Sequence, residues 1–379
     1  MPSSLSGVFG LLPARASVAA VLFLAACARH PAADGGPSAA TSTAHATSSA
    51  PPPASADLVA QGAALYARYC ALCHAKDATG YAADNAPSLV TRTFLESASD
   101  GFIADAIRNG RPSTAMGAYG KSRQGPLEEA DIRALLAFLR SHGPQPVSLP
   151  HSELKGDAVR GAVLFHDNCE RCHGTPTERK TAVSLFNPQF LAQATPDFLR
   201  YAIVNGRPPT PMPAFGTELT PAQDIEDLVA FIGSKTVALP APTVAKVPEN
   251  LPVVLNPKGK PPNFTLREDR FVPADEVKQA LAEHRKLVIV DARSPADWIA
   301  FHIPGAISAP YYNGTELDRI PNDGTWVLAY CACPHHASGA VVDALRQRGY
   351  KHTAVIDEGI LVWKSRGYPL AGEAVDKAP

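Results

Sequence analysis

Two short segments of the chain hold cysteine and histidine at a spacing that can do chemistry. Each reads Cys-x-x-Cys-His, at residues 70–74 and 169–173. Two cysteines three residues apart, on the turn that ends a helix, can form thioethers with both vinyl groups of a haem, and the next histidine can reach the iron. One copy alone could equally be a redox dithiol or half of a zinc site, but the repeated copy favours haem attachment. The residues predicted to attach and ligate haem are Cys70, Cys73, His74, Cys169, Cys172 and His173.

The methionines of the chain point to the second iron ligand. There are only three, and apart from Met1 they are Met116, 42 residues after His74, and Met212, 39 residues after His173. Methionine usually fills gaps in a core, and core filling is the alternative interpretation. Two methionines at matching places in loops rich in proline and glycine are poorly explained by it. We therefore predict two iron sites with one histidine and one methionine each, which raises the reduction potential relative to two histidines.

The two motifs lie in two copies of one unit. The segments that recur are residues 62–66 as 161–165 and residues 107–112 as 203–208. With their haem motifs and methionine loops, both copies resemble class I cytochrome c, over residues 56–143 and 151–235. The resemblance implies two all-α domains, two covalently bound haem c groups, and electron exchange with redox partner proteins.

The N-terminal segment predicts export. Residues 16–26 form an apolar run too short to span a bilayer, and the segment Leu24-Ala25-Ala26-Cys27 resembles a bacterial lipobox. The resemblance implies a signal peptide over 1–26 and a lipid on Cys27; an ordinary secretory signal is the alternative. Residues 27–55 are mostly Ala, Pro, Ser and Thr, which predicts a disordered tether. The expected location is the periplasmic side of a membrane, lipid-anchored, and the outer membrane is favoured because Ala28 is not Asp.

A different pattern begins after a proline-rich linker at 236–263. Apolar segments at residues 287–290, 326–330 and 353–356 predict buried strands, and residues 340–348 predict a helix between two of them. Strands separated by helices favour an α/β domain with a parallel sheet covered on both faces.

Several short motifs in this region carry a second resemblance. They are Val290-Asp291-Ala292-Arg293, Asp297-Trp298, His302-Ile303-Pro304-Gly305-Ala306-Ile307, Tyr330-Cys331, Asp357-Glu358-Gly359, Trp363 and Gly367-Tyr368-Pro369. Residues 264–375 thus resemble a rhodanese domain. The resemblance implies that the Asp, Arg and His of the early motifs order the loops, and that Cys331 is the active-site cysteine.

The loop after Cys331 departs from the rhodanese pattern. Cys331 ends a strand and precedes a helix, whose N–H groups would stabilise a thiolate or a persulfide; a buried structural cysteine is the alternative. His336 stands where an arginine is common, and imidazole offers no bidentate fork, so the loop is predicted to be unsuited to ordinary thiosulfate:cyanide sulfurtransfer. Cys333 adds a second thiol that could release bound sulfur. The candidate catalytic residues are Cys331, Cys333, His335 and His336, which could alternatively bind copper or zinc.

Composition narrows the function classes. With a net charge of -1, 45% hydrophobic residues and 19% charged residues, the chain gives no support to a nucleic-acid binder. A single short apolar run excludes a polytopic membrane protein. Three hypotheses stay open. The first is an enzyme that oxidises a small sulfur compound at Cys331 and passes the electrons to the haems. The second is an electron carrier whose rhodanese-like domain binds sulfur, a metal or a partner protein, and the third is a thiol sensor that gates electron flow. The enzyme would be a sulfur-compound:cytochrome c oxidoreductase or sulfurtransferase-like.

Overall fold

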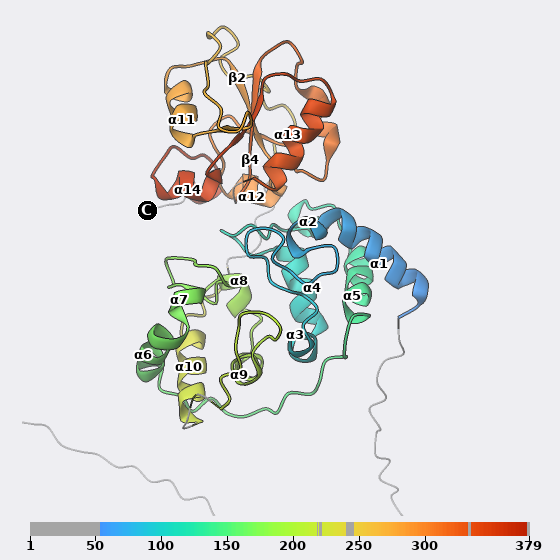
Figure 1. Cartoon of the computed structure of the whole chain (residues 1–379), viewed down its shortest axis with the longest axis vertical. Coiled ribbons are helices and arrows are strands. Elements are labelled where there is room, and N and C mark those ends of the chain that lie inside the picture. Colours follow the sequence, from blue (N-terminus) through green and yellow to red (C-terminus); the bar gives the residue numbers. More distant parts are fainter. Residues whose placement is uncertain (1–53, 218, 220–221, 240–245, 333–334, 377–379) are drawn as a thin grey trace, which may run out of the picture. The chain divides into compact units, whose positions relative to one another are not determined.

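The computed structural model describes residues 54–217, 219, 222–239, 246–332 and 335–376 (Figure 1). The predicted signal peptide, Cys27, nearly all of the predicted tether and Cys333 lie outside these residues. In the described part of the chain, no helix has the length and apolar content needed to cross a membrane.

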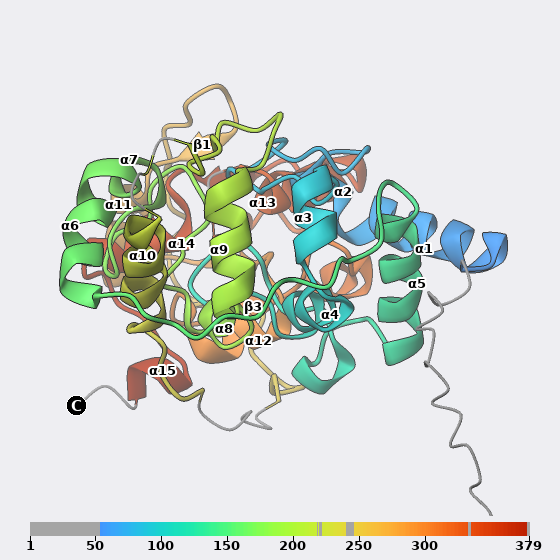
Figure 2. The same ribbon diagram turned by 90° about the horizontal axis from the view of Figure 1, so that it is seen from below.

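The first haem motif lies in a helical unit. Its elements are α1 (Ala56–Tyr69), α2 (Ala71–His74), α3 (Arg92–Ser97), α4 (Asp100–Asn109), the 3₁₀ turn η1 (Lys121–Arg123) and α5 (Glu129–Arg140). Helices α1 and α5 pack closely (Figure 2). Gly62 allows this approach, because a Cβ there would overlap the backbone carbonyl of Ala134. The tight crossing fixes the end of α1, where the haem motif begins.

The second haem motif lies in a copy of this unit. Its elements are α6 (Ala158–Asn168), α7 (Glu170–His173), α8 (Pro188–Leu191), α9 (Pro196–Asn205) and α10 (Gln223–Gly233). Gly161 plays the part of Gly62, since a Cβ there would overlap the carbonyl of Asp227 in α10. The two units share one apolar cluster, in which the rings of Phe102 and Phe198 stack with centroids 4.7 Å apart.

The C-terminal part is an α/β domain, as the alternating pattern predicts. Its five parallel strands lie in the order β1-β5-β4-β2-β3. They are β1 (Phe271–Val272), β2 (Leu287–Asp291), β3 (Ile307–Ser308), β4 (Trp326–Tyr330) and β5 (Thr353–Ile356). The remaining elements are α11 (Ala274–Ala282), α12 (Pro295–Ala300), η2 (Gly314–Arg319), α13 (Ala337–Gln347), α14 (Gly359–Ser365) and α15 (Glu373–Asp376).

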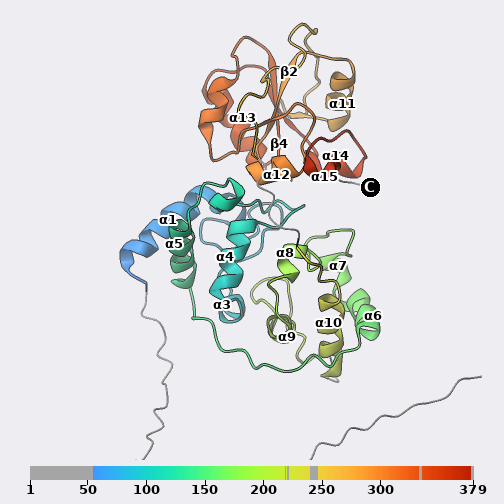
Figure 3. The same cartoon turned by 180° about the vertical axis from the view of Figure 1, so that it is seen from behind.

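Helices cover both faces of this sheet. Figure 3 shows α13 on one side of the strands and α11 with α14 on the other. Along β2, Val288 and Val290 pack with α13, whereas Leu287 and Ile289 pack with α11 and α14. The strand is therefore buried on both faces, which explains its continuous apolar sequence. Its carboxyl end and that of β4 lie at the same edge, where Cys331 follows.

Candidate functional sites

The first Cys-x-x-Cys-His motif forms the turn expected for haem attachment. Cys70 ends α1, and the short helix α2 carries Cys73 and His74, with the His74 backbone N–H donating to the Cys70 carbonyl at 2.9 Å. The buried His74 ring places Nδ1 2.8 Å from the Pro87 carbonyl, so Nδ1 carries the proton and Nε2 keeps its lone pair. Burial lowers the pKa of His74 despite that hydrogen bond, which keeps the ring neutral, as a metal ligand must be.

The second motif repeats this geometry. The His173 backbone N–H donates to the Cys169 carbonyl at 2.9 Å, and its Nδ1 lies 2.8 Å from the Val183 carbonyl. Burial lowers the pKa of His173 as well. Both histidines are thus neutral and oriented by a backbone carbonyl, with one ring nitrogen left for iron.

The methionines occupy matching loops. The backbone N–H of Arg111 donates to the Met116 carbonyl at 2.7 Å, and that of Arg207 donates to the Met212 carbonyl at 3.0 Å. In the second unit, Met212 and His173 line one cavity together, so the structure brings this predicted ligand pair to the same place.

The same cavity is lined by a buried cation and a buried hydroxyl group. Arg207 lines it, and burial lowers the pKa of its guanidinium to about 10. Among the described residues, Arg207 donates only to uncharged acceptors, namely the carbonyls of Thr93 and Gly206 and the hydroxyl of Ser97. The Thr91 hydroxyl also lines the cavity, is buried, and has no hydrogen-bond partner among those residues.

These features fit haem c. Two thiols at a helix-ending turn, a neutral histidine and a methionine sulfur are the donor set of a c-type cytochrome. A buried cation and an orphaned hydroxyl fit the carboxylates that the group carries. Arg207 and its counterpart Arg111 were not among the predicted site residues, although the repeated Asn-Gly-Arg-Pro segment was the signal that could have found them.

Cys331 lies at the carboxyl end of β4. Its side chain is buried, 3% exposed, and its Sγ lies 3.3 Å from the hydroxyl oxygen of Ser338 in the first turn of α13. The backbone N–H of Ile360 donates to its carbonyl at 2.9 Å. The cysteine is therefore held between a strand, the start of a helix and α14.

The two histidines of the loop, His335 and His336, have different surroundings. His335 adopts a left-handed conformation, with φ 91°, and its Nε2 lies 2.6 Å from a carboxylate oxygen of Asp357. Burial would raise the pKa of Asp357, but hydrogen bonds from Arg267 and His335 outweigh it and hold the pKa below its ordinary value. His336 is half-buried at the residue before α13. No three His, Cys, Asp or Glu side chains among the described residues form a metal-binding group.

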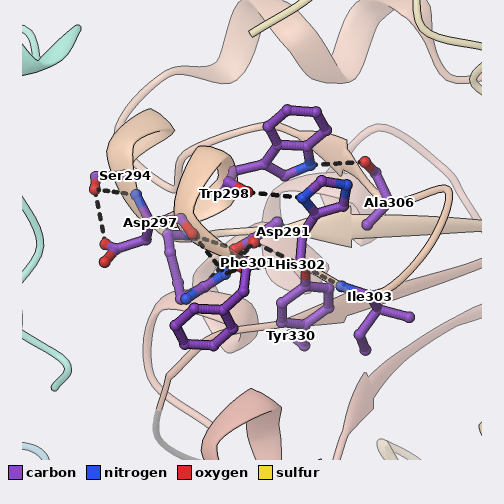
Figure 4. Close-up of polar contacts among 10 residues, drawn as sticks. Asp291, Ser294, Asp297, Trp298, Phe301, His302, Ile303, Ala306 and Tyr330 are labelled. Atoms are coloured by element: carbon purple, nitrogen blue, oxygen red, sulfur yellow. Dashed lines mark hydrogen bonds and ion pairs between the residues drawn. The ribbon is translucent and has the colours of Figure 1, made fainter. Parts of the chain in front are cut away.

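A buried polar network includes Tyr330, the residue immediately before Cys331 (Figure 4). Arg293 forms a bidentate pair with Asp291, at 2.7 Å and 3.0 Å, and donates to the Phe301 carbonyl at 2.6 Å. The Tyr330 hydroxyl donates to Asp291 at 2.8 Å and accepts from the Ile303 N–H at 3.2 Å. Since Tyr330 immediately precedes Cys331, this network fixes the strand end that carries the thiol.

The rings of Trp298 and His302 complete the network. They stack with centroids 3.8 Å apart, the Trp298 indole N–H donates to the Ala306 carbonyl, and His302 Nδ1 lies 2.7 Å from the Trp298 carbonyl. The Asp, Arg and His side chains of the early motifs thus connect loops by hydrogen bonds. None of these hydrogen bonds is made to Cys331.

Comparison with known proteins divides the chain in the same way. Residues 57–139 and 156–232 match the family described as cytochrome c oxidase, cbb3-type, subunit III, and residues 273–366 match the rhodanese-like domain family. The chain is 30% identical over 185 residues to the cbb3-type cytochrome c oxidase subunit FixP of a Bradyrhizobium species, covering 46% of this chain and 60% of that protein.

The C-terminal part has relatives of its own. It is 28% identical over 100 residues to a sulfurtransferase of Allochromatium vinosum, covering 26% of this chain and 92% of that protein. It is 31% identical over 97 residues to the probable adenylyltransferase/sulfurtransferase MoeZ of Mycobacterium tuberculosis, covering 25% and 24%. A rhodanese-like domain structure from Anabaena is similar at 24% identity and TM-score 0.27, covering 30% and 86%. The chain spans less than two thirds of the MoeZ and FixP relatives.

Proposed function

Since the chain combines cytochrome c domains with a C-terminal rhodanese-like domain, we propose that it transfers electrons drawn from a reduced sulfur compound held on Cys331. The observation that carries the proposal is the placement of Cys331 at the end of a strand. Its Sγ lies against the first turn of α13, and the preceding residue, Tyr330, is hydrogen-bonded to the buried Asp291. Small inorganic sulfur compounds are the substrates, and redox proteins take the electrons.

The chemistry at Cys331 balances with two haems. The Cys331 thiolate and hydrosulfide join through an S–S bond to give a persulfide anion, releasing one proton and two electrons. Two covalently attached haem c groups would supply one-electron acceptors for both electrons. The protein's own residues hold the reacting sulfur: Ser338 offers a hydroxyl to it, and Tyr330 with Asp291 fixes the backbone before it.

For attachment of the haems we propose Cys70, Cys73, Cys169 and Cys172 as the thioether residues. His74 with Met116, and His173 with Met212, are the proposed axial ligands. The orientation of both histidines by backbone carbonyls supports these pairs.

The proposed location is the periplasmic side of a bacterial membrane, with lipid on Cys27 and the outer membrane favoured. The lipobox-like segment and the composition of the following residues support this placement. An exported chain would also meet the machinery that joins haem to reduced thiols outside the cytoplasm.

Trapping the persulfide tests the proposal. Oxidised full-length protein is mixed with sulfide without oxygen, alkylated, digested and analysed by mass spectrometry. The expected product is a peptide carrying one extra sulfur on Cys331, absent from Cys331→Ser. Extra sulfur found only on other cysteines, or none at all, would contradict the proposal.

The burial of Cys331 favours a second candidate. The residue is 3% exposed, so its thiol is poorly accessible to a substrate, which fits a domain that serves as a docking module. The chain would then be an electron carrier alone. In that case Cys331→Ala leaves any haem reduction by sulfide unchanged, whereas the first proposal requires its loss.

A further inference from the structure

The two methionine loops stand at matching positions of the two units but differ in their surroundings. In the first unit, Gly117 and Ala118 directly after Met116 are buried. In the second unit, the corresponding Pro213 and Ala214 after Met212 are exposed. Because the two units are copies, the difference arises from what covers the first loop.

The rhodanese-like domain covers it. A Cβ on Gly117 would lie 2.9 Å from a carboxylate oxygen of Asp297 and 3.1 Å from the hydroxyl oxygen of Ser294. Ala115, on the other side of Met116, packs against the apolar cluster of buried residues that includes Cys331. The residues on both sides of Met116 thus contact the domain that carries the thiol.

Hydroxyl groups reinforce this contact. The Tyr119 and Tyr311 hydroxyl oxygens lie 3.2 Å apart, and the Tyr311 hydroxyl donates to the Tyr69 carbonyl, next to Cys70, at 2.8 Å. Tyr311 also packs against the Cys331 cluster. Phe215 stands at the position of Tyr119 in the second unit and has no hydroxyl for such a bond. The tyrosine pair therefore distinguishes the first unit from its copy.

We infer that the haem site of His74 and Met116 is the one that receives electrons from sulfur on Cys331, and that the site of His173 and Met212 receives them afterwards. This inference rests on the proposed function and adds an order to it. Ala115 and Tyr311 form the contact on the thiol side, and they act as positioning residues for the Met116 loop.

The contact between the two haem sites supports the same order. Pro87 accepts the Nδ1 hydrogen bond of His74 and also lines the cavity that contains His173 and Met212. Thr91, from the same segment of the first unit, lines that cavity too. A single short segment therefore joins the ligand of the first site to the wall of the second.

Ligand exchange tests the covering of the Met116 loop without any sulfur chemistry. Imidazole added to the oxidised protein displaces the methionine ligand when a loop opens, so two kinetic phases are expected, one for each haem site. The variants Met212→His and Met116→His assign these phases, because each variant removes the phase of its own site. We expect Met212 to be displaced faster. Tyr119→Phe should speed displacement of Met116 about fivefold, the factor that one net hydrogen bond represents, and Phe215→Tyr, the matched control, should change neither phase. Equal rates in the two sites would overturn the inference.

Anaerobic reduction by sulfide tests the order itself, with two haems per chain verified first by pyridine haemochrome. Histidine in place of methionine lowers the potential of its own site. Met116→His should slow reduction of the second site about tenfold or more, whereas Met212→His should leave the rate at the first site unchanged. If each variant affects only its own site, or if the pattern is reversed, the order is wrong and the proposed function stands. If sulfide reduces neither haem of the unmodified protein, the proposed function fails and the order with it.

Discussion

Asp291→Asn should destabilise the domain that carries Cys331 by a large and calculable amount. Asp291 is fully buried and accepts from the side chain and backbone of Arg293 and from the Tyr330 hydroxyl. The substitution removes the charge of the carboxylate that pairs bidentately with the buried Arg293 cation, while the hydrogen bonds from Arg293 to the Phe301 and Asp297 carbonyls remain. Breaking a buried pair in this way costs roughly 3–5 kcal/mol.

That loss is a large part of the stability of a domain of this size, which is about 5–15 kcal/mol. It corresponds to a decrease in melting temperature on the order of 15–30 °C. All three tryptophans of the chain, Trp298, Trp326 and Trp363, lie in the rhodanese-like domain, so their fluorescence reports its unfolding while haem absorbance reports the cytochrome domains.

Asp343→Asn is the matched control for this measurement. Its carboxylate pairs with Arg270 at 2.7 Å but is 53% exposed, and such pairs contribute about 0–1 kcal/mol. A decrease for Asp291→Asn no larger than that for Asp343→Asn would refute the reasoning, since the network would then contribute little to the fold beneath Cys331.

Other predictions follow from the same structure. The pKa of Asp357 lies below its ordinary 3.8 because Arg267 and His335 donate hydrogen bonds to its carboxylate, so these bonds add stability that is present above that pH and lost as the pH falls through the lowered pKa. The stability difference between wild type and Asp357→Asn, about 1 kcal/mol at pH 4 to 5, should therefore shrink as the pH is lowered from 4 to 2; a difference that stays the same down to pH 2 contradicts this. Arg207→Gln removes a buried cation, which should lower the potential of the second haem and leave the first unchanged in a spectroelectrochemical titration. Cys27→Ser should abolish labelling by fatty acid and release the protein from membranes; labelling that persists would exclude lipid on Cys27.

Local sequence patterns predict much of this molecule for physical reasons. Both Cys-x-x-Cys-His motifs lie on turns that end a helix, as predicted, and the strands predicted at 326–330 and 353–356 are observed as β4 and β5. The strands β1 and β3 have only two residues each, too few to show a period.

Tertiary contacts were beyond the reach of those patterns. The pairing of His335 with Asp357 joins two residues that are 22 positions apart in the chain. The covering of the Met116 loop depends on Tyr311 and Asp297, which no local spacing connects to Met116. The cation Arg207 was missed because its burial arises from packing between the two helical units.

The most direct test of the central claim counts electrons delivered by sulfur. Oxidised protein is titrated with sulfide in the absence of oxygen, and haem reduction is followed by absorbance, with dithionite added last to define full reduction. We predict two haem equivalents reduced for each sulfide consumed, and no reduction by sulfide in Cys331→Ala, whose haems dithionite still reduces. Unchanged reduction by sulfide in Cys331→Ala would contradict the claim that sulfur on this cysteine supplies the electrons.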